Sequence, residues 1–225
     1  MHLSQIASLI STPSRAKMLI HLLDGRIYPA SELAYEAKIK PQTASHHLSK
    51  MIEGGILHME KHGRHRYYKI ANAEVAQVLE TLLSISLPEK TSSFKQACQS
   101  EALKHARTCY DHLAGKLGVS VTNSLINQGY LIKDGLNFDV TDTGRHFFTH
   151  FDIDVDEVRQ RRRLFARACL DWSERQHHLG GALGFSLTSY FLNNNWVQRT
   201  PSCRSLIITD TGKKNIEKIF KISID

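Results

Sequence analysis

The sequence predicts a mainly α-helical protein with short β-hairpins, an α+β fold in two parts. Three observations support this fold class. A helix with a polar outer face is predicted over residues 41–53, a basic hairpin follows it over residues 56–70, and residues 101–220 contain an internal duplication. At 225 residues the chain is long enough for two modest domains, each with a core of its own.

The helix over residues 41–53 has one apolar and one polar face. Pro41 suits a first helical position, because the N–H that proline lacks would have no partner there, and Gly54-Gly55 ends the helix. Apolar side chains recur at helical spacing and should pack inward: Ala44, Leu48, Met51 and Ile52. Short polar groups can reach base edges and a lysine suits a phosphate. The expected DNA-contacting face consists of Gln42, Thr43, Ser45, His46, Ser49 and Lys50.

Elements on either side of this helix extend the pattern. A helix beginning near Ser31 is joined to it by the turn at 37–40, which is the spacing of a helix-turn-helix. Residues 56–60 and 66–70 alternate in polarity around Gly63, as in a hairpin. Arg64 and Arg66 at its tip are placed to contact phosphate or to enter a minor groove.

The same region carries excess positive charge. Residues 40–69 hold six Lys or Arg against two Asp or Glu, plus five His. A solvated basic face is the alternative explanation of such a run, but together with the helix pair it favours duplex DNA. The formal net charge of +7 for the whole chain also suits a polyanionic partner.

Residues 3–83 resemble the ArsR family of winged-helix repressors. The resemblance rests on four stretches: Ser11-Thr-Pro-Ser-Arg15 leading into Met18–Leu23, Ser31-Glu-Leu-Ala34, Ala44-Ser-His-His-Leu48, and Gly63-Arg-His-Arg-Tyr-Tyr68. It implies a winged helix-turn-helix in a homodimer that represses an operator and is released by an effector.

The chain departs from the metal sensors of that family. Where the arsenic and cadmium sensors carry closely spaced cysteines before the recognition helix, this chain has Glu32-Leu-Ala-Tyr-Glu-Ala37. Where the zinc and nickel sensors place Asp/His and His/Glu pairs on the last helix of the domain, it offers only Glu74 and Glu80. Neither metal site is therefore expected in the N-terminal domain.

The sequence also indicates the cellular compartment. A run of about 18 apolar residues, as needed for a membrane span, and a secretion segment are both missing, which favours the cytoplasm and no membrane partner. The cysteines lack the close pairing of a zinc knuckle or a redox motif and are expected to be thiols: Cys98, Cys109, Cys169 and Cys203.

The predicted domains are a DNA-binding domain over residues 1–83, a linker over 84–100 and a duplicated domain over 101–225. The boundary follows from the stretch 84–93, which is rich in Ser, Thr and Pro. Three motifs occur twice: Ala106-Arg-Thr-Cys-Tyr-Asp111 and Ala166-Arg-Ala-Cys-Leu-Asp171, His112-Leu-Ala-Gly-Lys-Leu-Gly118 and His178-Leu-Gly-Gly-Ala-Leu-Gly184, Val140-Thr-Asp-Thr-Gly144 and Ile208-Thr-Asp-Thr-Gly212.

Residues 101–150 and 161–220 therefore read as two copies of one unit. Each copy predicts a helix carrying Cys and Asp, a second helix after His-Leu-x-Gly, a short hairpin, and a helix opened by Thr-Asp-Thr-Gly. That order resembles a degenerate winged helix. Neither copy has a basic wing, so neither is expected to read DNA.

If the copies pack about a pseudo-twofold axis, the duplicated Cys, Asp and His side chains converge. The candidate effector site is Cys109, Tyr110, Asp111, His112, Cys169, Asp171, Trp172, His178 and Trp196. Four interpretations remain open. In the first, the cysteines are small buried hydrophobic residues and the aspartates bind Arg107 and Arg167. In the second, a ligand pocket is lined by Tyr110, Trp172 and Trp196, and in the third the cysteines act as a thiol switch. In the fourth, a Cys₂His₂ metal site, with sequence separations unlike those of a zinc finger, is formed by Cys109, His112, Cys169 and His178.

The predicted function is a sequence-specific, DNA-binding transcriptional regulator. The first hypothesis is a homodimeric repressor of a double-stranded operator, released by a small ligand, metal or oxidant sensed in the C-terminal domain. The alternative is a constitutive or architectural DNA-binding protein whose C-terminal half only dimerises. An enzyme and an enzymatic cofactor are not expected, because the one suggestive stretch, residues 171–178, lacks evidence of a third group holding a base.

Overall fold

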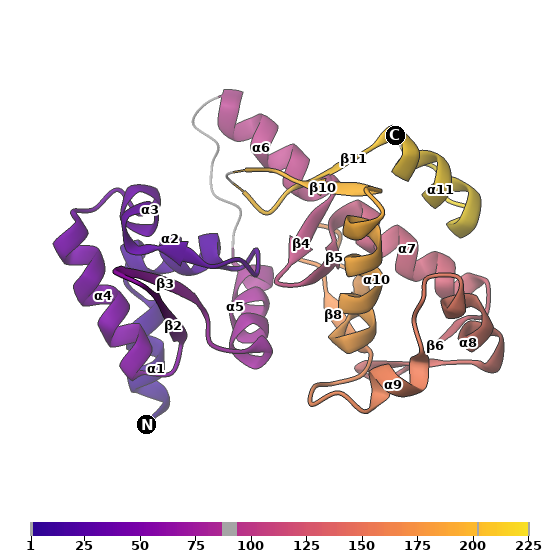
Figure 1. Ribbon diagram of the computed structural model, residues 1–225, viewed down its shortest axis with the longest axis horizontal. Helices are drawn as coiled ribbons and strands as arrows, with labels where there is room; N and C mark the ends of the chain where they lie inside the picture. Colours follow the sequence, from indigo (N-terminus) through magenta and orange to yellow (C-terminus); the bar gives the residue numbers. More distant parts are fainter. Residues whose placement is uncertain (1, 87–93, 202, 225) are drawn as a thin grey trace. The chain divides into compact units, whose positions relative to one another are not determined.

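A computed structural model describes residues 2–86, 94–201 and 203–224, with side chains of the helix at 94–105 described from residue 100 onward (Figure 1). The chain divides into two compact units, Met1–Leu82 and Leu83–Asp225. Among the described residues, no helix combines the length and the apolar character needed to cross a bilayer.

The first unit combines five helices with a three-stranded antiparallel sheet of order β1-β3-β2. In chain order its elements are α1 (Leu3–Ile10), α2 (Pro13–Leu22), β1 (Tyr28–Pro29), α3 (Ala30–Glu36), α4 (Pro41–Glu53), β2 (Leu57–His62), β3 (His65–Ile70) and α5 (Ala73–Ile85). The turn between α3 and α4 contains Lys38 with a positive φ of 54°, and the predicted helix-turn-helix is confirmed.

The predicted hairpin is formed by β2 and β3. Their antiparallel register runs from Leu57 opposite Ile70 to His62 opposite His65, so the turn contains only Gly63 and Arg64. Gly63 has a φ of +61°, a conformation that costs glycine little and that two-residue hairpin turns of the primed types require. This glycine sets the position of the arginine beside it.

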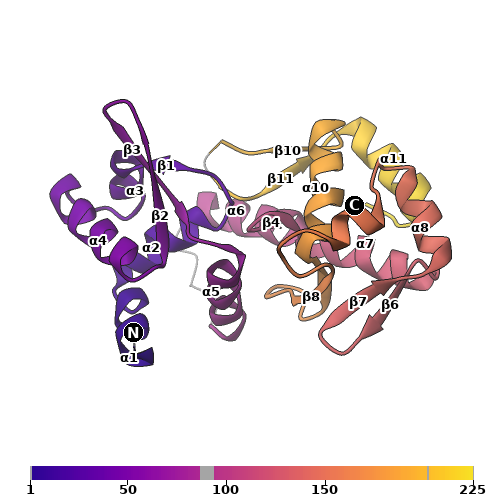
Figure 2. The same cartoon turned by 60° about the horizontal axis from the view of Figure 1, so that its bottom comes forward.

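The described residues of the second unit form three antiparallel sheets: β4-β5, β10-β11 and the four-stranded β6-β7-β8-β9 (Figure 2). Its elements are α6 (Phe94–His105), β4 (Arg107–Cys109), β5 (His112–Ala114), α7 (Gly115–Asn127), β6 (Leu131–Asp134), β7 (Asn137–Val140), α8 (Asp142–Thr149), α9 (Val155–Arg159), β8 (Arg167–Leu170), β9 (His177–Gly180), α10 (Gly181–Asn193), β10 (Val197–Arg199), β11 (Leu206–Ile208) and α11 (Asp210–Phe220). Residues 107–149 and 167–220 each run through strand, strand, 13-residue helix, strand, strand and helix.

The helices α8 and α11 begin at matching caps. Thr141 Oγ1 accepts a hydrogen bond from Gly144 N at 3.0 Å, and Thr209 Oγ1 accepts one from Gly212 N at 2.9 Å. Each threonine thus satisfies an N–H group that the first turn leaves without an intrahelical partner. The helices predicted from Thr-Asp-Thr-Gly are confirmed.

Two predictions about local structure are wrong. The segments carrying Cys109 and Cys169 are the strands β4 and β8, not helices. All three residues of β4 are buried, and a short strand with no exposed face lacks the alternation that would distinguish it from a buried helix. The expected linker over 84–100 is partly helical, because α5 continues to Ile85 and α6 begins at Phe94; its residues 87–93 lie outside the described part of the chain.

The two halves of the second unit are tied together by reciprocal hydrogen bonds. Thr188 Oγ1 on α10 accepts from Leu113 N on β5 at 2.9 Å, and Thr122 Oγ1 on α7 accepts from Leu179 N on β9 at 2.8 Å. In keeping with this exchange, α7 contacts β9 and α10 contacts β5. Each half therefore satisfies a buried backbone donor of the other.

Candidate nucleic-acid interface and buried cysteine-histidine cluster

The helix α4 presents the polar face that the sequence predicts. Ala44, Leu48 and Met51 are buried in the first unit. Every side chain predicted to contact DNA from this helix is exposed: Gln42, Thr43, Ser45, His46, Ser49 and Lys50. The apolar periodicity that buries one face of α4 leaves these donors and acceptors facing solvent.

The hairpin tip carries the cations. Arg64 and Arg66 are exposed, and within the described part of the chain neither has an ion-pair partner. Lys69, lower on β3, lies 2.5 Å from Glu60 Oε1 on β2, and its hydrogen bond lowers the pKa of that carboxyl group. The charge of Lys69 is thus partly neutralised, whereas the side chains of Arg64 and Arg66 remain exposed to solvent.

In the second unit, two hairpins bring the duplicated cysteines and histidines together. Cys109 on β4 is the cross-strand partner of His112 on β5, and Cys169 on β8 is the cross-strand partner of His178 on β9. Side chains of cross-strand partners project from the same face of a sheet. Because β5 contacts β9, the two pairs meet.

The four side chains form a compact and buried cluster. The sulfur atoms of Cys109 and Cys169 are 3.7 Å apart, and the Nε2 atoms of His112 and His178 are 3.2 Å apart. One ligand atom from each of the four residues lies within 4.8 Å of the others. Their exposed fractions are 8% or less. We call these four residues the Cys-His cluster.

Each histidine of the Cys-His cluster turns its other nitrogen toward an aspartate. His112 Nδ1 lies 3.2 Å from Asp111 Oδ1, and His178 Nδ1 lies 3.1 Å from Asp171 Oδ2, the latter at an angle that departs from a hydrogen bond. Arg163 Nη1 binds Asp111 Oδ2 at 2.6 Å. Both rings are therefore held with Nδ1 toward a carboxylate and Nε2 toward the cluster.

Asp171 is the most enclosed acid of the site. Its Oδ1 accepts from Arg107 Nη2 at 2.8 Å and from Ser173 Oγ at 2.8 Å, and its Oδ2 accepts from Gly115 N at 2.7 Å. Burial opposes ionisation, but His178 and Arg107 outweigh it and hold the pKa of Asp171 well below its usual value. The carboxylate is charged and satisfied.

The electrostatics of His112 differ from those of an isolated buried histidine. Burial lowers the pKa of His112, but Cys109 and Asp111 raise it by more than burial lowers it, and the resulting pKa is about 10. This direction favours the protonated imidazolium of His112 beside the Cys109 sulfur, so a metal ion bound here would have to displace that proton.

A glycine makes room for this arrangement. Gly180 lies two positions after His178 on β9 and therefore on the same face of the strand. A Cβ atom at Gly180 would lie 3.1 Å from His112 Nε2 and 3.4 Å from the Cβ of Cys169. A side chain at this position would press on two members of the Cys-His cluster.

The aromatic candidates lie in different surroundings. Trp196 belongs to the main core with Phe151, Tyr190 and Phe191, whereas Cys109 and Cys169 pack with Ala114 in a separate small cluster. The expectation that Trp196 joins the cysteines is wrong, because its ring is large enough to be drawn into the aromatic core of the unit.

Trp172 and Tyr110 remain near the hairpins. The guanidinium of Arg107 lies 4.4 Å from the centre of the Trp172 ring, and Tyr110 occupies the β4-β5 turn with a φ of 58°. The expected aspartate–arginine pairing is confirmed for Asp171 with Arg107, whereas Asp111 pairs with Arg163 instead of Arg167.

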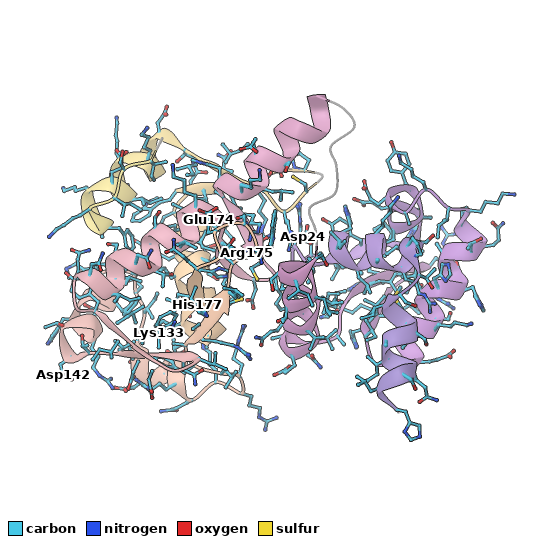
Figure 3. The ribbon with its side chains drawn as sticks, turned by 180° about the vertical axis from the view of Figure 1, so that it is seen from behind. Asp24, Lys133, Asp142, Glu174, Arg175 and His177 are labelled. Carbon is cyan, nitrogen blue, oxygen red and sulfur yellow. The ribbon has the colours of Figure 1, made fainter. Side chains whose placement is uncertain are left out.

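His177 does not take part in the Cys-His cluster. It precedes His178 on β9, and successive strand residues point to opposite faces. Its Nδ1 lies 3.1 Å from Lys133 Nζ on β6, and the two side chains lie next to each other (Figure 3). Burial first and then Lys133 lower the pKa of His177, so this imidazole is held neutral.

Sequence reasoning missed the residues that support the cluster: Arg163, Gly180, Thr122 and Thr188. The duplication contained a signal for the threonines. Thr122 and Thr188 are 66 positions apart, the same offset that separates His112 from His178. Extending the alignment of the copies along the helices would have paired them.

Comparison with known proteins agrees with this architecture. A helix-turn-helix domain model matches residues 9–60. The HTH-type transcriptional regulator YdfF of Bacillus subtilis (strain 168) is 50% identical over 223 residues, which is 99% of this chain and 99% of YdfF. The chain belongs to the helix-turn-helix transcriptional regulators. Because the similarity spans nearly its whole length, it includes both units of this regulator.

A shorter similarity is confined to part of the regulator. The HTH-type transcriptional regulator CmtR of Mycobacterium tuberculosis (strain ATCC 25618 / H37Rv) is 29% identical over 99 residues, 44% of this chain and 80% of CmtR. The solved structure of the cadmium metal-sensor CMTR from Mycobacterium tuberculosis is 28% identical with a TM-score of 0.33, and the match covers 40% of this chain and 94% of that one.

Proposed function

We propose that this regulator binds a double-stranded operator as a homodimer of the ArsR type, represses it, and is released by a signal that the second unit receives. The observation that supports DNA binding is the two-faced character of α4: three of its four inward-facing apolar residues are buried and Ile52 is partly buried, while all six predicted contact residues are exposed. An exposed polar face on a helix that follows a helix-turn is the geometry with which such proteins enter a major groove about 12 Å wide.

The contact residues divide into two roles. Thr43, Ser45 and His46 have short side chains near the start of α4, where base edges are read. Lys50 on α4 and the arginines of the β2-β3 turn carry long cationic side chains, which reach phosphates. We therefore assign base discrimination to the first set and affinity to the second.

An apolar surface on the first unit supports dimerisation. None of the residues of α1 is buried, although Leu3, Ile6 and Ile10 recur on one side of it. On α5, Val78 is 56% exposed and Leu82 is 37% exposed. Apolar groups left outside a core gain free energy when a second copy covers them, at roughly 25 cal/mol per Å². A twofold dimer would place two α4 helices at half-sites about 34–36 Å apart.

Selection of binding sites from random duplex DNA tests the proposal. We expect an inverted repeat, bound by a dimer in light scattering. Ser45→Ala should relax the preference at one or two positions, by about 1–3 kcal/mol per base pair, and Ser189→Ala in the second unit serves as the matched control. The proposal of a dimer on a symmetric operator would be overturned if the selection yields no symmetric site. It would also be overturned if light scattering shows only monomers with and without the selected DNA.

A constitutive role for the second unit is the alternative outcome. A signal that binds the folded second unit must raise its stability by RT ln(1 + [L]/Kd) and must change operator affinity. If metal salts, oxidants and metabolites leave operator affinity unchanged while binding to DNA persists, the regulator is constitutive.

A further inference from the structure

We propose that Cys109, His112, Cys169 and His178 bind one transition-metal ion of the zinc class in a tetrahedral Cys₂His₂ site within the second unit. The inference is independent of operator binding, since all four ligands belong to the second unit. Both thiolate and imidazole ligands suit zinc.

The distances between like atoms match a tetrahedral zinc site. The edge of a tetrahedron is about 1.63 times the distance from its centre to a corner. With Zn–S near 2.3 Å and Zn–N near 2.0–2.1 Å, a site has S···S edges of about 3.8 Å and N···N edges of about 3.3 Å. The corresponding distances here are 3.7 Å between the sulfur atoms and 3.2 Å between the Nε2 atoms. These two edges match a tetrahedral site, and side-chain movement would bring together the four ligand atoms, which all lie within 4.8 Å of one another.

The orientation of the imidazoles is that of metal ligands. Nδ1 of His112 and of His178 faces Asp111 and Asp171, so with a metal ion bound each ring would carry its proton on Nδ1 and present its Nε2 lone pair to the ion. Without metal, a proton on one Nε2 can bridge the two nitrogen atoms at 3.2 Å, and a bound metal ion would take the place of that proton. A carboxylate behind each ligating histidine is the usual second layer of a metal site, where it orients the ring and raises its basicity.

Charge balance also favours the ion. Binding of M²⁺ releases two protons to solvent, whether Cys109 and His112 start as thiol with imidazole or as thiolate with imidazolium, and it forms two metal–sulfur and two metal–nitrogen bonds. The product has no net charge, because the two thiolates neutralise the ion. A neutral assembly can remain buried at a much lower desolvation cost than a lone charge.

Four protein ligands leave no open coordination position, so the site is structural and not hydrolytic. Its ligands come from two hairpins whose cysteines are 60 positions apart. Bound metal therefore cross-links the two halves of the second unit and stabilises the folded unit, since the unfolded chain does not hold the four ligands together. An organic effector would need more space than four atoms within 4.8 Å provide.

Cobalt titration of the full chain tests the proposal. The protein is first freed of metal with a chelator under reducing conditions, and Co²⁺ alone is then added. We expect one Co²⁺ per chain, with the intense visible absorption of tetrahedral cobalt and thiolate-to-cobalt charge transfer, and displacement by Zn²⁺. Elemental analysis of the protein as purified should find one zinc-class ion per chain.

Cysteine variants identify the ligands. The double variant Cys109→Ser, Cys169→Ser should lose the charge-transfer band and fall from one bound ion per chain to none, whereas Cys203→Ser should bind like the parent. If the parent binds no Co²⁺ or Zn²⁺, or if the double variant keeps the charge-transfer band, the site is not metal-binding.

A further measurement uses the unsubstituted protein and so does not depend on whether the variants fold. Alkylation followed by mass spectrometry should show Cys109 and Cys169 protected with Zn²⁺ and modified faster after chelation, while the rate at Cys203 stays unchanged. Equal rates with and without Zn²⁺ would overturn the proposal. So would a Cys109–Cys169 disulfide in the purified protein, which requires the sulfurs to close from 3.7 Å to about 2.05 Å.

Discussion

The two units of this regulator use polar side chains in opposite ways. The first unit exposes them, since Gln42, Ser45 and Arg64 all face solvent. The second unit buries them, since Arg107, Asp171 and His178 are each at most 1% exposed. Exposed polar groups cost little stability and are free to meet a partner, whereas buried ones must be satisfied within the fold.

This difference separates recognition from architecture. A substitution on the exposed face of α4 or at the hairpin tip should change DNA binding and leave the folded state intact. A substitution in the buried polar network should change the folded state first. The following predictions test this contrast, beginning with the largest expected effect.

Asp171→Asn should destabilise the second unit by about 3–5 kcal/mol, because it leaves the buried Arg107 guanidinium without a counter-charge. Urea denaturation of the full chain, followed by a signal of the second unit, measures this free energy of unfolding. Asp111→Asn is the matched control, and its effect should be smaller because Asp111 and Arg163 are 16% and 24% exposed. Equal effects of the two variants would contradict the burial argument.

Thr122→Val and Thr188→Val should each destabilise the second unit by about 1–3 kcal/mol. Each variant keeps the volume of the side chain but leaves a buried backbone N–H, of Leu179 or Leu113, without an acceptor. Thermal or urea unfolding measures the loss. Since the two bonds occupy equivalent places, the two values should agree within about 0.5 kcal/mol; a large difference would show that the halves are not equivalent.

Metal occupancy of the Cys-His cluster should change operator affinity about 5–150-fold if the second unit regulates the first. Operator titrations with the zinc-loaded and the chelator-treated protein measure this change, and the double variant Cys109→Ser, Cys169→Ser should lose it. By reciprocity, operator must change zinc affinity by the same factor. Metal binding without any change in operator affinity would leave the site purely structural.

Arg64→Ala should have the smallest effect on folding and a defined effect on DNA binding. The exposed side chain has no ion-pair partner among the described residues, so the free energy of unfolding should change by less than about 0.5 kcal/mol. Binding should weaken on all sequences, and the slope of log K against log salt should fall by roughly one unit. An unchanged slope would show that the hairpin tip does not contact phosphate.

The same contrast explains which features the sequence revealed. The helix α4 and the β2-β3 hairpin were predictable because their signals are local: Pro41 and Gly54 bound the helix, and Gly63 marks the turn. Solvent exposure on one face gives each element a clear period, and that period assigned the contact residues correctly to the surface.

Buried elements gave weaker local signals. The strand β4 has no exposed residue, so its pattern was mistaken for a helix, and the partner of Asp111 could not be inferred because Arg163 is distant in sequence. Only the repetition at offsets of 60 and 66 indicated that Cys109 meets Cys169 and that His112 meets His178. The repeated motifs supplied long-range information that periodicity cannot contain.

The reciprocal threonine bonds also bear on how the chain is made. Thr188 serves a backbone group 75 positions earlier, and Thr122 serves one 57 positions later. The first bond cannot form until α10 has left the ribosome and the second cannot form until β9 has, whereas the helix-turn-helix closes through contacts within a few tens of residues. During synthesis the first unit is therefore expected to fold first, and a nascent chain stalled before α10 would carry a finished helix-turn-helix without a completed second unit.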